Sequence, residues 1–361
     1  MGEPSLRQSV DVAFVGWQTL PAVWPHFGRR IGGLETAMWT LARNLAAETN
    51  LHVALLTSAP RRGAPSRIDG VTLWVEVDRW RQIRQRVGDA IDWRRRRLRQ
   101  WTWDLLWQVP LLALTHPFRP RDVAPTAADP RVLRRQARLW VAFGASDDAA
   151  RVIVAARRLG RPSVLFLQSN LDVDPRLLTD DPPSSPYGDS AEGRRMAIQQ
   201  ATAIVCQSQW QMDVLEQHFH RRGTLIRNPI DRSAWRLPKD MTEPYVLWIG
   251  RFDTFHKRPA LLIDVARRCP EIPFLMVAND FDDQVRRELT AQLPPNISLR
   301  SYVPFDEMPS VFQRAGAFVS TGDPAYEGFP NVLLQAAASH TPIFSMQDYD
   351  EFLNHSGSGV V

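Results

Sequence analysis

The sequence predicts an α/β protein of two Rossmann-like, doubly wound domains that face each other across a cleft. At 361 residues, the chain is longer than a single hydrophobic core ordinarily organises. Short β-branched runs alternate with helical patterns, which is typical of parallel sheets covered by helices. The segment RLPKDMTEP at 236–244 lacks apolar periodicity and separates two such series. We therefore expect an N-terminal domain at 1–237 and a C-terminal domain at 238–361.

The N-terminal domain is expected to follow a βαβ order. Runs rich in valine, isoleucine and leucine predict strands, and apolar residues repeating every three to four positions predict helices. The expected strands lie at 10–15, 52–57, 71–77, 139–143, 163–167 and 203–206, and the expected helices at 34–47, 147–159 and 210–219. Residues 79–138 interrupt this order and form a basic and aromatic insertion.

The C-terminal domain has the clearer pattern. Its expected strands lie at 245–249, 274–278, 297–302, 317–321 and 342–345, and its expected helices at 259–268, 283–293, 305–315 and 331–339. In doubly wound sheets, ligands bind beyond the carboxyl ends of the strands. Two facing sheets are therefore expected to hold substrates in the cleft between them.

Composition excludes several classes of protein. The chain is 44% hydrophobic and 23% charged, as a globular protein is. Its two cysteines, Cys206 and Cys269, stand beside apolar residues, so neither a disulfide framework nor a cysteine metal site is expected. The first apolar run, at 10–15, is too short for a signal peptide or a membrane span. We expect a cytoplasmic protein, at most peripheral on the inner face of a membrane.

Two groups of residues suit a diphosphate. In RIGGLE at 30–35, Gly32 and Gly33 precede the first long helix, where backbone amides can approach an anion. Gly250 and Arg251 directly follow a central strand, and Lys257 precedes the next helix. Cations at that edge of a sheet are suited to stabilising a leaving diphosphate.

The string EGFPNVLLQ carries a third group. Glu327 is expected on a loop and Gln335 two turns into the following helix, so that one carboxylate and one amide reach sugar and ribose hydroxyls. The backbone amides between them are expected to be exposed at the helix N-terminus, which favours phosphate. The intervening residues are Gly328, Phe329, Pro330 and Asn331.

The strings GRFDTFHK and TGDPAYEGFPNVLLQAAASHTPIFS resemble the retaining GT-B glycosyltransferases of the glycogen-synthase and phosphatidylinositol-mannosyltransferase type. RIGGLETAMWTLARNLA, ATAIVCQSQWQMDVL and IRNPID are similar to further blocks of that family in the same order, so the resemblance covers nearly everything outside 80–138. It implies a GT-B fold and a metal-independent, cofactor-free enzyme. Such an enzyme moves a sugar from a nucleoside diphosphate sugar to a glycan or a lipid-linked acceptor.

The resemblance also implies roles for the matching residues. Arg251 and Lys257 would hold the donor diphosphate, Glu327 would contact the transferred sugar, and Gly33 would lie near the phosphates. Glu35 and Gln168 would lie on the acceptor side. In the family a glutamate stands where this chain has Gln335, and a histidine commonly stands where it has Gln168. The family continues with helices that return over the N-terminal domain, whereas this sequence ends at 361.

Other functions remain open at this stage. Asp172 and Asp174 form a DxD pattern that can chelate a metal in a different glycosyltransferase fold. A sugar-nucleotide epimerase or a phosphorylase would share the fold and the diphosphate site. Gln335 and Gln168 also fit a non-catalytic binding subunit. Nucleic-acid binding is not expected, because no recognisable reading module accompanies the arginines.

The stretch at 79–109 favours contact with an anionic membrane. Nine arginines and two aspartates lie between positions 79 and 99. If the stretch is one helix, a single apolar face contains Ile83, Val87, Ile91, Leu98, Trp101 and Leu105. Such a helix would lie in a lipid interface. The alternative is a helix packed on the N-terminal domain with a solvated basic face.

Overall fold

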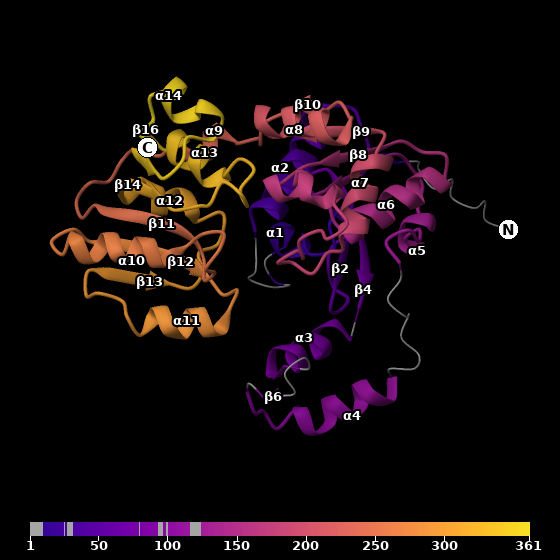
Figure 1. The fold of residues 1–361 in the computed structure, drawn as a ribbon, viewed down its shortest axis with the longest axis horizontal. Coiled ribbons are helices and arrows are strands. Elements are labelled where there is room, and N and C mark those ends of the chain that lie inside the picture. The colour runs from indigo at the N-terminus through magenta and orange to yellow at the C-terminus, as the bar shows by residue number, and fades with distance from the viewer. Residues whose placement is uncertain are drawn as a thin grey trace.

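The computed structural model describes residues 10–24, 26, 32–78, 80–92, 97–98, 100–115 and 124–361. Arg30 and the arginines at 94–96 lie outside these described residues. Within the described part, the chain forms two large sheets, of eight and six strands, each flanked by helices (Figure 1). The expected α/β class with two doubly wound sheets is confirmed.

The N-terminal sheet has the strand order β10-β9-β8-β7-β1-β2-β4-β3 among the described residues. All its pairings are parallel except the antiparallel pair of β3 and β4. Its strands are β1 (Val10–Val15), β2 (Val53–Ala59), β3 (Arg67–Ile68), β4 (Val71–Val77), β7 (Ala137–Phe143), β8 (Ser163–Phe166), β9 (Ala203–Cys206) and β10 (Thr224–Leu225). Its helices are α1 (Leu20–Val23), α2 (Gly33–Glu48), α5 (Pro130–Leu133), α6 (Asp147–Arg158), α7 (Ala191–Gln200) and α8 (Gln209–Phe219).

Alternate residues of β1 pack into separate cores on the two faces of this sheet, as the two-residue period of a strand requires. Val12 and Phe14 pack with Met38 of α2, whereas Ala13 and Val15 belong to the core that α6, α7 and α8 cover. The central strands are apolar on both faces for this reason. The sequence had not indicated α7.

The C-terminal sheet has the order β13-β12-β11-β14-β15-β16 among the described residues, with parallel pairing throughout. Its strands are β11 (Tyr245–Arg251), β12 (Phe274–Asn279), β13 (Ile297–Arg300), β14 (Ala315–Ser320), β15 (Ile343–Ser345) and β16 (Gly359–Val360). Its helices are α10 (Pro259–Arg268), α11 (Asp283–Thr290), α12 (Met308–Arg314), α13 (Asn331–Ala338) and α14 (Phe352–Ser356). Every strand and helix expected in this half is present, with ends that shift by a few residues.

Between the two sheets, the short helix α9 (Arg232–Trp235) already packs with the C-terminal half. Trp235 is buried, and its ring contacts those of Phe305 and Phe312. Lys239, inside the expected linker, donates to the carbonyl oxygens of Phe312 and Ala315 at 2.8 and 2.6 Å. The chain is therefore tied to the second core before residue 237.

The stretch at 79–109 is not the single helix that we expected. Helix α3 (Arg81–Ala90) ends where the short strands β5 (Ile91–Asp92) and β6 (Arg97–Leu98) pair, and α4 (Leu105–Thr115) follows. Val87 and Leu105, expected on the lipid-facing side, are buried together, with Ile83 and Ile91 packed against them. The prediction of that face is wrong because the apolar side of α3 is covered by α4. We call residues 80–115 the arm.

The arm projects away from the body of the N-terminal domain, below β2 and β4 in Figure 1. None of the helices in the described ranges is both long enough and apolar enough to cross a membrane.

Candidate functional site

A cavity of about 760 Å³ lies between the two halves of the molecule, and both halves line it. Its walls are the segments that directly follow strands in each sheet. Gln168 follows β8 on the N-terminal side, and Arg251 ends β11 on the C-terminal side. The cavity is thus at the edge where ligands of doubly wound sheets bind.

The cavity collects most of the predicted site residues. The expected residues that line it are Gly32, Gly33, Glu35, Gln168, Gly250, Arg251, Lys257, Glu327, Phe329, Pro330 and Asn331. Gly328 and Gln335 lie elsewhere. A Cβ at Gly328 would stand 2.5 Å from Gln207 Oε1 and 2.8 Å from the Gln168 carbonyl oxygen, so a glycine is needed for this close packing.

Glu327 is the central acid of the C-terminal wall. It lies between β14 and α13, and only 6% of the residue is exposed. The Lys257 ammonium forms an ion pair with its Oε1, and His256 Nε2 lies 3.0 Å from the same oxygen. Burial alone would raise the pKa of Glu327, but the Lys257 and His256 contacts outweigh it and hold that pKa well below its usual range. Glu327 is therefore a charged hydrogen-bond acceptor at neutral pH.

Asp253 positions the cations of this wall. Its buried carboxylate accepts from the backbone amides of His256 and Lys257 at 2.8 and 2.7 Å. The second oxygen accepts from Arg251 Nε at 2.6 Å. One carboxylate thus links the end of β11 to the loop before α10, so Arg251 and Lys257 keep a constant spacing.

Arg251 also contacts the N-terminal half. Its Nη2 donates to the Tyr187 hydroxyl at 2.7 Å and bonds to His256 Nδ1 at 2.8 Å. Because a guanidinium only donates, Nδ1 must accept, which leaves the imidazole proton on Nε2, facing Glu327. The guanidinium carbon lies 4.2 Å from the centre of the Phe281 ring and 5.3 Å from that of Tyr187. These contacts hold a cation at the cavity wall with its orientation set in advance.

The N-terminus of α13 faces the cavity without a capping side chain. Asn331 and Val332 line the cavity, and no hydrogen bond within the described residues engages their backbone amides. The Phe329 amide, which we had expected to be exposed, instead donates to Gln207 Oε1 at 2.9 Å. At this helix end, the backbone amides that remain open to an anion are therefore those of Asn331 and Val332.

The glycine loop meets that helix from the opposite side. Asn331 Nδ2 donates to the Gly33 carbonyl oxygen at 2.9 Å, and a Cβ at Gly33 would lie 3.2 Å from the same nitrogen. Glu35 accepts from the Gly32 amide at 3.0 Å and so caps α2. Burial raises the pKa of Glu35. Within the described residues, the Glu35 carboxylate thus binds the backbone at the start of its own helix.

Gln168 and the DxD pattern share one loop. The Gln168 side chain donates to the Leu167 carbonyl oxygen at 3.0 Å, while its backbone amide donates to Asp172 at 2.7 Å. Burial raises the pKa of Asp172 to about 6. Asp174 pairs with Arg176 at 2.6 Å. The two aspartates are thus bonded to their own loop, and no group of three metal-ligating side chains occurs within the described ranges.

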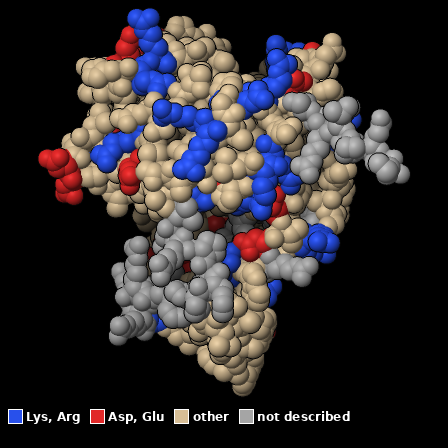
Figure 2. Space-filling view, turned by 90° about the vertical axis from the view of Figure 1, so that its right-hand side faces the viewer, with Lys and Arg blue, Asp and Glu red and all other residues tan. Residues whose placement is uncertain are grey.

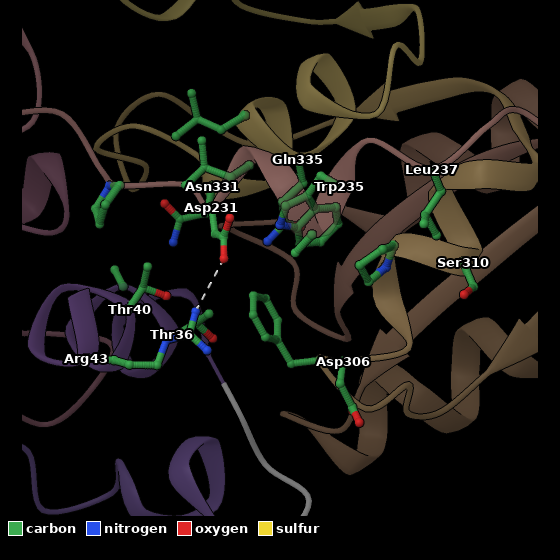
Figure 3. A pocket seen from close by; sticks show the side chains of 17 residues that line it. Thr36, Thr40, Arg43, Asp231, Trp235, Leu237, Asp306, Ser310, Asn331 and Gln335 are labelled. Carbon is green, nitrogen blue, oxygen red and sulfur yellow. Dashed lines mark ion pairs between the residues drawn. The ribbon is translucent and has the colours of Figure 1, made fainter. Parts of the chain in front are cut away.

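Gln335 lines a second, smaller cavity of about 370 Å³, shown in Figure 3. Trp235 and Phe305 give this cavity an aromatic wall, and Thr36 and Arg43 of α2 face them from the N-terminal half. Arg43 forms an ion pair with Asp231 at 3.7 Å across it. Asn331 lines both cavities, so the two are neighbours on either side of the α13 N-terminus.

Sequence reasoning missed four residues that organise the site. His256 and Asp253 lie within GRFDTFHK, but their contacts with Glu327 and Arg251 depend on folding. Tyr187 stands in an irregular loop without periodicity. Asn228, in IRNPID, donates to Asn331 Oδ1 at 2.6 Å and accepts from Gln207. The short motifs around His256, Asp253 and Asn228 were the only sequence signal for a role, and Tyr187 had none.

Residues 243–361 match the family model described as "Glycosyl transferases group 1". The C-terminal part of the chain is therefore similar to a group 1 glycosyltransferase domain. A comparison with curated protein sequences finds no match. The matched segment contains Arg251, Lys257 and Glu327 of the larger cavity and Gln335 of the smaller one. The C-terminal wall of the larger cavity therefore lies in the part of the chain that matches this family.

Solved structures match this chain over both halves. Anabaena HepE in complex with UDP and glucose has 16% identity and a TM-score of 0.60, over 95% of this chain and 82% of that one. Sucrose-phosphate synthase from Thermosynechococcus elongatus has 16% identity and a TM-score of 0.60, over 93% and 81%. The catalytic domain of Arabidopsis thaliana starch synthase IV, bound to ADP and acarbose, has 11% and 0.60, over 96% and 84%. At these identities the likeness establishes the fold.

Proposed function

We propose that this protein is a glycosyltransferase that moves a sugar from a nucleoside diphosphate sugar to a glycan or a lipid-linked acceptor, with retention of the anomeric configuration. One observation carries the proposal. Arg251, Lys257 and the uncapped N-terminus of α13 converge on one wall of the larger cavity. Two cations and a helix end form a site for a diphosphate without a metal ion.

The two neighbouring cavities suit different parts of the donor. The smaller one has an aromatic wall and the Gln335 amide, which suit a base and a ribose. Asn331, shared by both cavities, marks where the diphosphate would pass. The sugar would then lie beside Glu327 in the larger cavity. HepE and starch synthase IV, which have the same fold, were solved with UDP and ADP respectively, and this supports a nucleotide donor.

In the proposed reaction, the bond from the sugar C1 to the phosphate oxygen breaks as a bond to the acceptor oxygen forms on the same face. The acceptor proton passes to the leaving phosphate, so no side-chain base is required and Gln168 is tolerated. Lys257 and Arg251 stabilise the charge that develops on the diphosphate. Glu327, kept ionised, accepts hydrogen bonds from sugar hydroxyls and orients the ring.

The acceptor would occupy the N-terminal side of the larger cavity. Gln18, Phe143, Ser146 and Asp189 line that side together with Gln168. Hydroxyl and carboxylate groups beside an aromatic ring suit a polyhydroxylated acceptor.

The test incubates the purified protein with a panel of sugar nucleotides and follows nucleoside diphosphate release. Nuclear magnetic resonance of the released or transferred sugar then gives its configuration. We expect slow hydrolysis of one donor with retention, lost in Lys257→Ala and kept in Arg267→Ala, an exposed cation on helix α10, which follows Lys257. Inversion would refute the same-face reaction. Donor binding without turnover would indicate a binding subunit, and interconversion of donors an epimerase.

A further inference from the structure

Helix α4 of the arm exposes a continuous apolar stripe. Trp103, just before the helix, is 78% exposed, and Leu114 near its end is 73% exposed. Leu106 and Trp107 lie between them and are also exposed. Positions 107, 110 and 114 are spaced by three and four residues, so their side chains share one helical face, and Trp103 precedes them in the turn before the helix. Residues 105–115 contain no charged residue.

The opposite face of α4 already has a partner. Leu105 is buried against Val87 and Ala90 of α3, and Val109 and Leu112 pack on the same cluster. The helix is therefore apolar on both sides, and only one side is covered. A helix of that kind is normally buried all round or lies in lipid.

Further exposed apolar side chains precede the helix. The Trp101 and Trp103 rings lie 6.2 Å apart in an edge-to-face arrangement, and Leu98 is exposed on the preceding strand. Trp107 Nε1 donates to Asp104 at 3.2 Å, so the polar group of this indole is satisfied and its ring is free to enter an apolar medium.

Charged and apolar side chains occupy different parts of the N-terminal domain and its arm. Figure 2 shows Lys and Arg side chains over the body of the N-terminal domain, while the described tip of the arm below carries none in this view. Arg84 pairs with Asp78 where the arm joins β4, and Arg86 and Arg97 are exposed farther along it. The arm thus presents exposed apolar side chains together with exposed arginines, which suit the hydrocarbon and the phosphates of a bilayer respectively.

The net positive charge of residues 79–99 favours anionic over neutral lipids. Nine arginines and two aspartates lie between positions 79 and 99. Near an anionic leaflet, basic residues attract the protein while tryptophans settle at the level of the headgroups. We infer that the α4 stripe is a membrane-docking surface that inserts into an anionic leaflet. This inference does not depend on the donor chemistry.

The test measures co-sedimentation with vesicles of phosphatidylcholine alone or mixed with phosphatidylglycerol. We expect binding to the anionic vesicles, little to the neutral ones, and loss at high salt because the charges are screened. A double variant Trp103→Ser, Trp107→Ser should weaken binding at least about tenfold, since each buried indole contributes strongly. The matched control is Trp210→Ser, an exposed tryptophan on α8 of the same domain.

A second variant separates charge from insertion. Arg86→Gln with Arg97→Gln should weaken binding to anionic vesicles and leave the tryptophan fluorescence of the unbound protein unchanged. Circular dichroism must show that both variants are folded. Equal binding by the Trp103 and Trp107 double variant and the wild type would overturn the inference. So would concentration-dependent dimers in sedimentation velocity that disappear in that variant, because the stripe would then cover a second copy.

Discussion

The ion pair between Lys257 and Glu327 allows a test of what stabilises the C-terminal wall of the larger cavity. We consider the variant Lys257→Met, which keeps the length of the side chain and removes its charge. Glu327 would remain 6% exposed, with His256 Nε2 at 3.0 Å as its remaining side-chain partner in the described structure. Leaving one charge of a buried pair uncompensated typically destabilises a protein by about 3–5 kcal/mol.

The geometry places the expected cost at the lower end of that range. Lys257 opens onto the cavity, with 22% of its side chain exposed, so water can partly solvate the abandoned carboxylate. We expect Lys257→Met to lower the free energy of unfolding by about 3 kcal/mol. Glu327→Gln should lower it by about 1–2 kcal/mol, because the Lys257 ammonium can then turn to the solvent. The double variant buries no lone charge and should cost about 2 kcal/mol, well below the sum of the single changes.

Urea unfolding at neutral pH gives these free energies, and hydrogen exchange of residues 245–361 assigns them to the C-terminal domain. The pH dependence provides a second check. Because the pKa of Glu327 is lowered in the folded state, its contribution to stability is present above the ordinary value of 4.5 and is lost as the pH falls. The difference between the wild type and Glu327→Gln should therefore shrink on acidification. Strictly additive costs, or a difference that grows in acid, would refute the pairing.

Three further predictions concern the donor site. Arg251→Ala should lower transfer by about 2–4 kcal/mol in activation free energy without unfolding the protein, as kinetics and circular dichroism would show; unchanged turnover would remove it from the site. Gln335→Glu should tighten binding of the nucleoside diphosphate, measured by calorimetry, because a carboxylate accepts more strongly from ribose hydroxyls; weaker binding by a folded variant would give Gln335 another role. Tyr187→Phe removes the hydroxyl that bonds to Arg251 and His256 and should raise the KM for the donor by up to about tenfold, whereas a changed stability with unchanged KM would mark a purely structural contact.

Much of the fold could be predicted because local patterns report on local structure. The runs at 10–15, 71–77 and 203–206 and the helix at 259–268 occur with the predicted ends, since a strand buried on both faces must be apolar throughout and a covered helix must be amphipathic. The C-terminal wall of the larger cavity was also predictable in part. Arg251 and Lys257 stand six positions apart around one strand end, so their proximity follows from the chain itself.

Tertiary structure decided which of these groups meet. Glu327 is 70 residues from Lys257, and the two join only because β11 and β14 are neighbours in the sheet. Tyr187 reaches Arg251 from an irregular loop of the other domain, where no periodic signal exists. The Phe329 amide was expected to be free, but Gln207 of the facing domain occupies it.

The arm shows most clearly what the sequence alone could not predict. The sequence by itself determined that residues 79–115 are basic, rich in tryptophan and apolar in stripes, because these are properties of the residues alone. It did not determine which stripe is covered. The face that contains Ile83 and Val87 is buried against Leu105, and the face of Trp103 and Trp107 is left outside. A hydrophobic pattern indicates that a surface will be covered, but only the packing of the folded chain shows which element covers it.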